Sequence, residues 1–346
     1  MAVIVRAVHL DTEREELLAA LEQNLTDLPH ARRFKWLYHD NPEGPAWSWF
    51  VCDRASGQVH GVASVFRRAM WLGSRVSLCG QVGDFAIDAG YRSLGPAVML
   101  QRATFEPVDQ GGLALCYDCP PHERGMSTFR RLGMAASATL VRHARLLRTD
   151  RRLAERFGAA GRALAPVGNV LLRAAGGSRT RGTGVEIARH EGRFDDEFSA
   201  LDGRVGASDV IRGRRSAADL NWRYRDDPLH EYVTLTARRR GELIGFLILA
   251  FGGGDGIVVD LFGRLTAEAT GPLLEGAADE ARAAGAETLH LYLSAGSPME
   301  ADLPPAGFRR REEGPRLVAY APAGTEPGGE SDRARPWNVT HADVMA

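Results

Sequence analysis

The chain has 346 residues, about twice a typical domain, so its length predicts two domains or one large α/β domain. Hydrophobic residues make up 44% and charged residues 25%, which excludes a disordered chain, and the net charge of -1 argues against a whole-protein field built for nucleic acid. No apolar run approaches the roughly 18 residues of a membrane span and no secretion signal is visible. Four cysteines are too few for a disulfide scaffold, so we expect a cytoplasmic protein.

The segment at residues 34–42 has a second copy later in the chain. Phe34-Lys-Trp-Leu-Tyr-His-Asp-Asn-Pro42 is matched by Leu220-Asn-Trp-Arg-Tyr-Arg-Asp-Asp-Pro228, with the shared frame Trp-x-Tyr-x-Asp-(Asn/Asp)-Pro. The aromatic residues suit either packing at a helix end or a sugar-binding platform. Because they recur in both copies, packing is the favoured interpretation.

Each copy continues with the same predicted elements. A β-hairpin comes first, at residues 47–66 and 232–251. A strand, a helix and a buried strand follow, at 82–88, 96–105 and 113–117 in the first copy and at 257–262, 272–284 and 288–293 in the second. Each copy closes on a glycine and an apolar residue, at Gly133-Met134 and Gly307-Phe308. The sequence therefore predicts two copies of one α/β (α+β) fold in tandem.

We expect the first unit at residues 1–141, a basic helical connector at 142–183 and the second unit at 184–346. Residues 142–181 contain ten arginines and two acids, Asp150 and Glu155. Such a segment is typical of an interdomain helix with a solvated basic face, or of a contact with anionic lipid or an acidic partner. Residues 321–335 are predicted to be a loop, after which Trp337 docks again.

A turn with small residues joins the predicted strand 82–88 to the helix after it. Arg92-Ser-Leu-Gly95-Pro-Ala97 has the pattern Arg-x-x-Gly-x-Ala. A phosphate site needs small residues that let the backbone approach an anion, and free N–H groups at a helix N-terminus. Gly95 and Ala97 meet the first requirement.

The second copy lacks this turn. Gly61 and Gly133 are 72 positions apart, whereas the corresponding Gly245 and Gly307 are 62 apart, and Glu268 in the shortened stretch would repel a phosphate. The sequence therefore predicts a cofactor site in the first copy alone. The glycine run at 252–256 is predicted to be a hairpin turn, because no helix follows it.

With this turn, its strand and helix, and the segment Phe129-Arg-Arg-Leu-Gly-Met134, the chain resembles the GNAT superfamily of acyl-CoA N-acyltransferases. The resemblance covers most of the chain as two GNAT-like halves, each a mixed central sheet flanked by helices. It implies acetyl-CoA or another acyl-CoA as co-substrate, with no metal. It implies that coenzyme A contacts Phe85, Ala86 and Ile87 on the strand, Arg92, Ser93, Leu94, Gly95, Ala97 and Val98 at the turn, and Phe129 in the closing helix.

The resemblance also implies a carboxylate base on the strand before the turn. Asp84 and Asp88 share a face of that strand by their even spacing, and Asp84 is the first candidate because it lies further from the turn. The family's leaving-group acid is commonly a tyrosine at the position of Phe129, which cannot donate a proton. Tyr117 and His122, with Asp118 between them, are the candidate replacements.

In the resemblance the early segment borders the acceptor cleft, so His39, Asp40 and Asn41 are candidate acceptor-binding residues. Cys116-x-x-Cys119 is one cysteine pair and falls short of the four ligands of a zinc site.

The predicted function is acetyl transfer to a primary amine of a small molecule, with an amino sugar of surface polysaccharide synthesis as one acceptor. No nucleic-acid partner and no integral membrane segment are expected. The alternatives are a non-catalytic ligand sensor or scaffold and a tRNA-dependent aminoacyl transferase.

Overall fold

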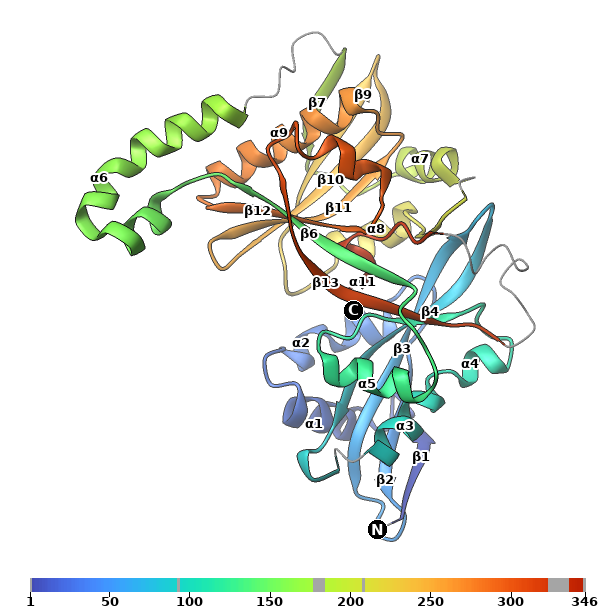
Figure 1. Ribbon diagram of the computed structural model, residues 1–346. Coiled ribbons are helices and arrows are strands. Elements are labelled where there is room, and N and C mark those ends of the chain that lie inside the picture. The colour runs from blue at the N-terminus through green and yellow to red at the C-terminus, as the bar shows by residue number, and fades with distance from the viewer. Residues whose placement is uncertain (1, 92–93, 177–183, 207–208, 323–335, 345–346) are drawn as a thin grey trace.

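The computed structural model describes residues 2–91, 94–176, 184–206, 209–322 and 336–344 (Figure 1). The first half contains β1 (Val3–Ala7), α1 (Arg14–Asn24), α2 (His30–Phe34), the π-helical turn η1 (Lys35–His39), β2 (Trp47–Asp53), β3 (Val59–Leu72), β4 (Arg75–Ile87), the 3-10 turn η2 (Ala89–Tyr91), α3 (Leu94–Ala103), α4 (Glu106–Asp109), β5 (Cys116–Asp118), α5 (Glu123–Arg131) and β6 (Ala138–Leu146). Helix α6 (Asp150–Gly176) connects the halves.

The second half repeats this order. It contains β7 (Val185–His190), α7 (Asp196–Gly206), β8 (Ile211–Gly213), α8 (Ala217–Tyr224), β9 (Val233–Arg239), β10 (Glu242–Gly252), β11 (Asp255–Gly263), α9 (Ala267–Ala283), β12 (Thr288–Ser294), the 3-10 turn η3 (Pro298–Asp302), β13 (Arg309–Tyr320) and α11 (His341–Val344). These bounds confirm the predicted hairpins, strands and helices of both copies, except that the strand predicted at 113–117 is a shorter β5 at Cys116–Asp118. None of the helices in the described part of the chain has the length and apolar character that crossing a membrane requires.

Hairpin turns form where the sequence supplies suitable side chains and glycines. Between β2 and β3 the Asp53 carboxylate accepts the backbone N–H groups of Ala55 and Ser56, both at 2.9 Å. Between β10 and β11, Gly253 and Gly254 have φ values of 60° and 83°, which glycine adopts without strain. The predicted hairpin turn in this glycine run is therefore confirmed.

Helices cover both faces of each half's sheet. In the first half, α1 and α2 pack on one face and α3 and α5 on the other. In the second half, α7 and α8 cover one face and α9 the other. The alternation of buried side chains along the central strands supplies an apolar surface to each layer.

The last strand of each half pairs with the other half. The sheet order is β1-β2-β3-β4-β5-β13-β6-β12-β11-β10-β9-β7, so β13 lies next to β5 and β6 lies next to β12. Val318 of β13 pairs with Asp118, and Leu146 of β6 pairs with Thr288. The two halves therefore share one continuous mixed sheet. The division at residue 141 stays a prediction as a domain boundary, and β6 runs across it.

The repeated tryptophans contact each other. Trp36 and Trp222 stack with ring centroids 5.2 Å apart. The indole N–H of Trp36 donates to the carbonyl oxygen of Trp222 at 2.7 Å, and that of Trp222 donates to the carbonyl of Trp36 at 2.9 Å. This reciprocity is typical of an approximate two-fold relation between matching segments. It supports the packing interpretation of the aromatic repeat.

The reciprocal pair predicts energetic coupling between the two repeats. In a double-mutant cycle, Trp36→Phe and Trp222→Phe should show a coupling of about 1 kcal/mol in the free energy of unfolding, because each change removes one shared hydrogen bond and alters the ring stack. Urea unfolding of the full chain measures it. Trp337→Phe is the control, because Trp337 packs in a different cluster and should act additively with Trp36→Phe. Additive effects of Trp36→Phe and Trp222→Phe would contradict the coupling.

Candidate functional site

In the first half, strand β4 contains a β-bulge, and beside this bulge β4 separates from its neighbour β5. In the β3–β4 register, Val62 pairs with Ala86 and Ser64 with Gly83, so Asp84 and Phe85 together oppose one residue of β3. Asp84 has a φ of 48°, the left-handed region that few non-glycine residues adopt. A bulge of this kind bends the strand and redirects its side chains.

Beside the bulge, β4 leaves its parallel neighbour β5. The two strands pair at Gly80–Cys116 and at Gln81–Tyr117. Over the described residues the register shows no β4–β5 pair beyond these, although β4 continues to Ile87. Residues 82–87 of β4 therefore face the parted side, where the resemblance implies the pantetheine contacts of Phe85, Ala86 and Ile87.

The end of β4 leads through η2 to the N-terminus of α3. Gly95, in the first turn of α3, is exposed, and a Cβ added there would meet no atom within 4 Å. Ala97 and Val98 are half-buried on the same helix. A helix N-terminus offers an anion its backbone N–H groups and the positive end of the helix dipole, and Pro96 removes one of these donors in α3. Arg92 and Ser93 lie outside the described residues, and Leu94 is described only in its backbone.

Asp84 lies in a buried hydrogen-bond network on the α1–α2 face. Its Oδ1 accepts from Arg33 Nη2 at 2.5 Å and its Oδ2 accepts from the Tyr38 hydroxyl at 2.6 Å. Ser64 Oγ in turn donates to the Tyr38 oxygen at 3.2 Å. Burial, with the Asp84 charge second, raises the pKa of Tyr38 well above its usual value, so the hydroxyl stays a donor. Both Asp84 oxygens are therefore occupied by partners that fix the bulge.

The second half repeats this arrangement around Asp260. Its carboxylate accepts from the Tyr224 hydroxyl at 3.2 Å and from Arg215 Nε at 2.7 Å. Asp260 occupies the place of Asp84, and Tyr224 that of Tyr38, in a half that lacks the phosphate-type turn. The recurrence favours a structural role for the buried carboxylate, and the catalytic role of Asp84 stays a prediction.

Asp88 directly follows β4 and, like Asp84, contacts the α1–α2 side of the sheet, as the spacing predicts. It accepts from Asn24 Nδ2 of α1 at 2.8 Å, and its other oxygen lies 3.1 Å from His60 Nδ1. The His60 ring stacks on Tyr91 of η2 with centroids 3.6 Å apart. These contacts hold the path of the chain from β4 toward α3.

Tyr117 and Asp118 lie where β5 ends. The Tyr117 hydroxyl donates to Gln81 Oε1 at 3.4 Å, and burial raises its pKa above the usual range. Asp118 pairs through its backbone with Val318 of β13, and burial raises the pKa of its carboxyl to about 7. No ion pair to Asp118 occurs among the described residues. Burial thus favours the neutral form of this carboxyl.

The other candidates from the closing segment lie elsewhere. His122 is exposed at the N-cap of α5. Phe129 is fully buried in the core between the sheet and helices α3 and α5. The structure therefore brings Tyr117 and Asp118 to the parted strands and leaves His122 at the surface.

The three candidate acceptor residues have different surroundings. Asn41 is buried, where its Nδ2 donates to the Arg67 carbonyl at 2.9 Å and its Oδ1 accepts from the Glu43 N–H at 2.9 Å. Asp40 forms an exposed ion pair with Lys35 at 2.6 Å. Half-buried His39 packs edge-on against a phenylalanine of α2. Asn41 thus holds a loop, and acceptor binding by these residues stays a prediction.

The thiols of buried Cys116 and half-buried Cys119 are poor nucleophiles. Burial raises the pKa of Cys119 to about 12 and that of Cys116 further, so both thiols are protonated at neutral pH. The described residues contain no group of three or more His, Cys, Asp or Glu side chains arranged to hold a metal ion.

In the second half, the C-terminal tail lies where the strands part. There β11 and β12 pair from Gly256–Leu289 to Val258–Leu291. Beyond this point Thr340 bridges to β12 through Leu293, and its Oγ donates to Asp260 Oδ1 at 3.0 Å. The tail therefore fills the region of the second half that corresponds to the gap between β4 and β5 in the first half. Buried Trp337 confirms that the tail docks after the predicted loop.

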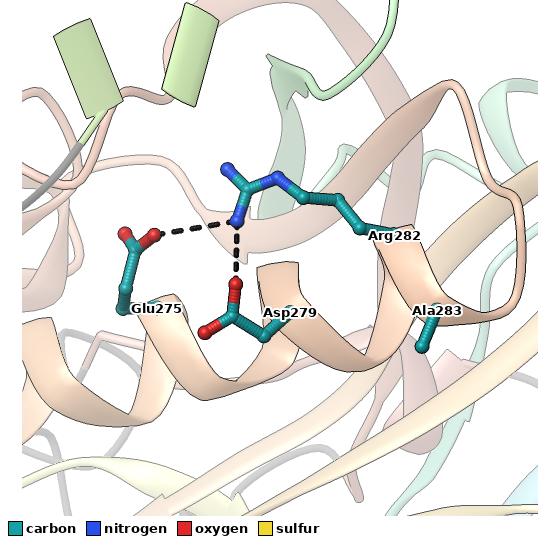
Figure 2. Close-up of a pocket in the computed structure, with 4 residues that line it drawn as sticks. All are labelled: Glu275, Asp279, Arg282 and Ala283. Atoms are coloured by element: carbon teal, nitrogen blue, oxygen red, sulfur yellow. Dashed lines mark hydrogen bonds and ion pairs between the residues drawn. The ribbon is translucent and has the colours of Figure 1, made fainter. Parts of the chain in front are cut away.

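A separate hollow lies on the outer side of α9 (Figure 2). It is lined by Glu275, Asp279, Arg282 and Ala283. Arg282 Nη1 lies 3.4 Å from Glu275 and 2.7 Å from Asp279 (Figure 2). Its charges already pair with one another, and it belongs to the second half rather than to the parted strands β4 and β5.

Solved structures resemble the whole chain. A probable N-acyltransferase of unknown function from Enterococcus faecalis is 13% identical, with a TM-score of 0.66 over 93% of this chain and 73% of that one. A GCN5-related N-acetyltransferase from Anabaena variabilis is 12% identical, with a TM-score of 0.65 over 92% and 73%. Saccharomyces cerevisiae N-myristoyltransferase, solved with myristoyl-CoA and inhibitors, is 11% identical, with a TM-score of 0.60 over 99% and 86%.

The chain has a tandem GNAT fold. The predicted fold class is thereby confirmed, and the resemblance to GNAT proteins is confirmed at the level of the fold. No family model and no curated protein sequence matches the chain. Within this GNAT fold, Asp118 is the residue whose surroundings the sequence did not reveal, because they depend on strand β13, almost two hundred positions away.

Removing the charge of buried Asp84 should lower the free energy of unfolding far more than removing that of exposed Asp40. Asp84→Asn should lower the free energy of unfolding by about 3–5 kcal/mol, because it leaves the Arg33 guanidinium buried without its counter-ion. Asp40→Asn, which breaks the exposed pair with Lys35, should cost about 1 kcal/mol or less. Urea unfolding at neutral pH compares the two variants. Equal small effects would show that Asp84 is not an anchor of the bulge.

Proposed function

We propose that the first half is an acyl-CoA-dependent N-acyltransferase that acts on a primary amine. One arrangement within the tandem GNAT fold supports this proposal. The bulge in β4, the parting of β4 from β5 and the exposed N-terminus of α3 follow one another along the chain. In this proposal the pyrophosphate of coenzyme A binds at the first turn of α3. The pantetheine arm lies along residues 82–87, with its amides paired to the parted edge of β4.

Asp118 supplies the proton transfer in this proposal. An acceptor amine attacks only when neutral, and a carboxyl with a pKa of about 7 can take its proton under neutral conditions. The nitrogen forms a bond to the thioester carbon, the carbon–sulfur bond breaks, and the proton held by Asp118 passes to the departing thiolate. The products are an amide and free coenzyme A. Buried Tyr117 donates to Gln81 of β4 and packs in the apolar cluster that contains Trp337.

The acceptor and the acyl chain belong to the same proposal. We propose acetyl-CoA as the acyl donor and a small-molecule amine, with an amino sugar as the first acceptor to test. Thiol release over acyl-CoAs of increasing chain length and over a panel of amines and amino sugars identifies both. The buried Phe129 in place of a tyrosine acid favours a ligand sensor as the second candidate. Binding of coenzyme A without turnover on any amine would support the sensor.

A charge placed at the α3 turn should abolish coenzyme A binding. Gly95→Asp should weaken the affinity by at least about a hundredfold, because a carboxylate beside the pyrophosphate costs several kcal/mol of repulsion. The fold should survive, since an acidic side chain suits a helix N-terminus. Gly271→Asp, at the Gly-Pro step of α9 that corresponds to Gly95-Pro96 in the sequence, should bind normally. Calorimetry with acetyl-CoA measures both, and unchanged affinity in Gly95→Asp would show that the turn is not the pyrophosphate site.

Asp118→Asn should lower activity and raise stability together. We expect kcat to fall by about 10²–10⁴, and the rise of the wild-type rate as pH passes about 7 to disappear, because the base must be ionised. Burial raises this pKa from its ordinary 3.8, so the stability contributed by Asp118 is present below pH 3.8 and lost as the pH rises through about 7. The variant should therefore unfold at a higher temperature than wild type at pH 8.

The control for this prediction is Asp226→Asn, because Asp226 forms an exposed ion pair with Arg193 in the second half, away from the parted strands β4 and β5. It should leave kcat and its pH profile unchanged. Full activity in Asp118→Asn, with the wild-type pH profile, would remove Asp118 from the mechanism while leaving coenzyme A binding to be judged by the turn variants.

A further inference from the structure

Helix α6 carries a surface that the acyl-transfer proposal does not use. It consists of two helical segments that meet at Gly158, whose φ is 59°. Figure 1 shows them standing away from the sheet. On the inner side, a Cβ at Gly161 would collide with the Leu153 carbonyl, and one at Gly168 would lie 2.7 Å from Thr149 Oγ1. Small residues therefore let the second segment fold back closely on the first.

The base of α6 is fixed to the molecule. The Thr149 N–H donates to Asn169 Oδ1 at 2.8 Å, and Asn169 Nδ2 donates to Asp150 Oδ2 at 2.9 Å. Arg151 forms an ion pair with Glu287 at 3.1 Å, next to the start of β12. These contacts hold the inner side of α6 and present its outer side to the surroundings.

The outer side is apolar. Phe157, Leu164, Val167 and Val170 have exposed fractions of 54%, 56%, 61% and 64%. They are four of the eight large hydrophobic residues that the described part of the chain exposes. The other four are scattered over other elements, so this concentration on one helix marks an interaction surface.

The same helix is basic. Its sequence holds arginines at 151, 152, 156, 162 and 173 and acids only at Asp150 and Glu155. Asp150 pairs with Arg148 at 3.0 Å and Glu155 with Arg151 at 3.8 Å, and no acid follows until residue 186. Since the whole chain has a net charge of -1, the positive charge is a local property of this helix.

We propose that the outer side of α6 binds an anionic phospholipid surface and lies in the plane of the membrane interface. Apolar side chains that are exposed along one side of a helix enter the boundary between headgroups and acyl chains, while arginines pair with the phosphates above them. Charge complementarity selects an anionic rather than a neutral surface. The proposal is independent of acyl transfer, because the residues that line the parted strands do not come from α6.

Vesicle binding by the full chain tests this inference. We expect the protein to sediment with vesicles of phosphatidylcholine and phosphatidylglycerol but not with phosphatidylcholine alone, and the bound fraction to fall with added salt. The double variant Leu164→Glu, Val167→Glu should weaken partitioning by at least about tenfold, because it replaces two membrane-facing apolar groups by charges. Both positions are exposed, so thermal unfolding should match wild type.

Phe251→Glu is the matched control, because it makes the same change at an exposed hydrophobic residue of β10. It should bind vesicles as wild type does. Absence of binding to anionic vesicles, or equal binding by the double variant, would overturn the proposal. A dimer that sedimentation velocity detects without vesicles, and that the double variant dissociates, would also overturn it, since a second copy would then cover this surface.

Discussion

The structure depends on a buried carboxylate that must be paired. A carboxylate in the interior is expensive unless charged and hydrogen-bonding partners surround it. Asp84 meets this condition with Arg33 from α2 and Tyr38 from the π-helical turn. The requirement ties the helical face of the first half to the bulge of β4. The bulge in turn lies where β4 parts from β5, so one ion pair links the packing of α2 to the shape of the candidate site.

The same constraint explains the aromatic repeat. In Trp-x-Tyr, the tyrosine points inward to the bulge carboxylate of its own half, and the tryptophan two positions earlier contacts the other half. One short motif thus satisfies a buried charge and joins the two copies. These two structural roles explain why the motif recurs in the second half, which lacks the phosphate-type turn.

Local patterns in the sequence predicted the elements well but not the pairing between distant strands. The hairpins at residues 47–66 and 232–251 follow from period-two alternation and turn residues that are neighbours in the chain. The exchange of β6 and β13 depends on contacts between segments more than 140 residues apart, which carry no local signal. Asp118 illustrates the consequence. Its place after a buried strand was readable, whereas the burial that raises its pKa depends on β13 beside it.

The C-terminal tail contacts both halves, although the candidate site lies in the first half alone. Asp343 is fully buried against Arg215 of the second half, and its carboxylate also lies 3.8 Å from Arg68 of β3. Trp337 packs with its ring centroid 5.8 Å from that of Tyr117. The tail that fills the parted strands of the second half therefore also supports the wall of the parted strands in the first. Because a buried charge and a buried ring both cross the boundary, separating the halves would leave Arg68 unpaired and Tyr117 uncovered, so the candidate site of the first half requires the second half to be present.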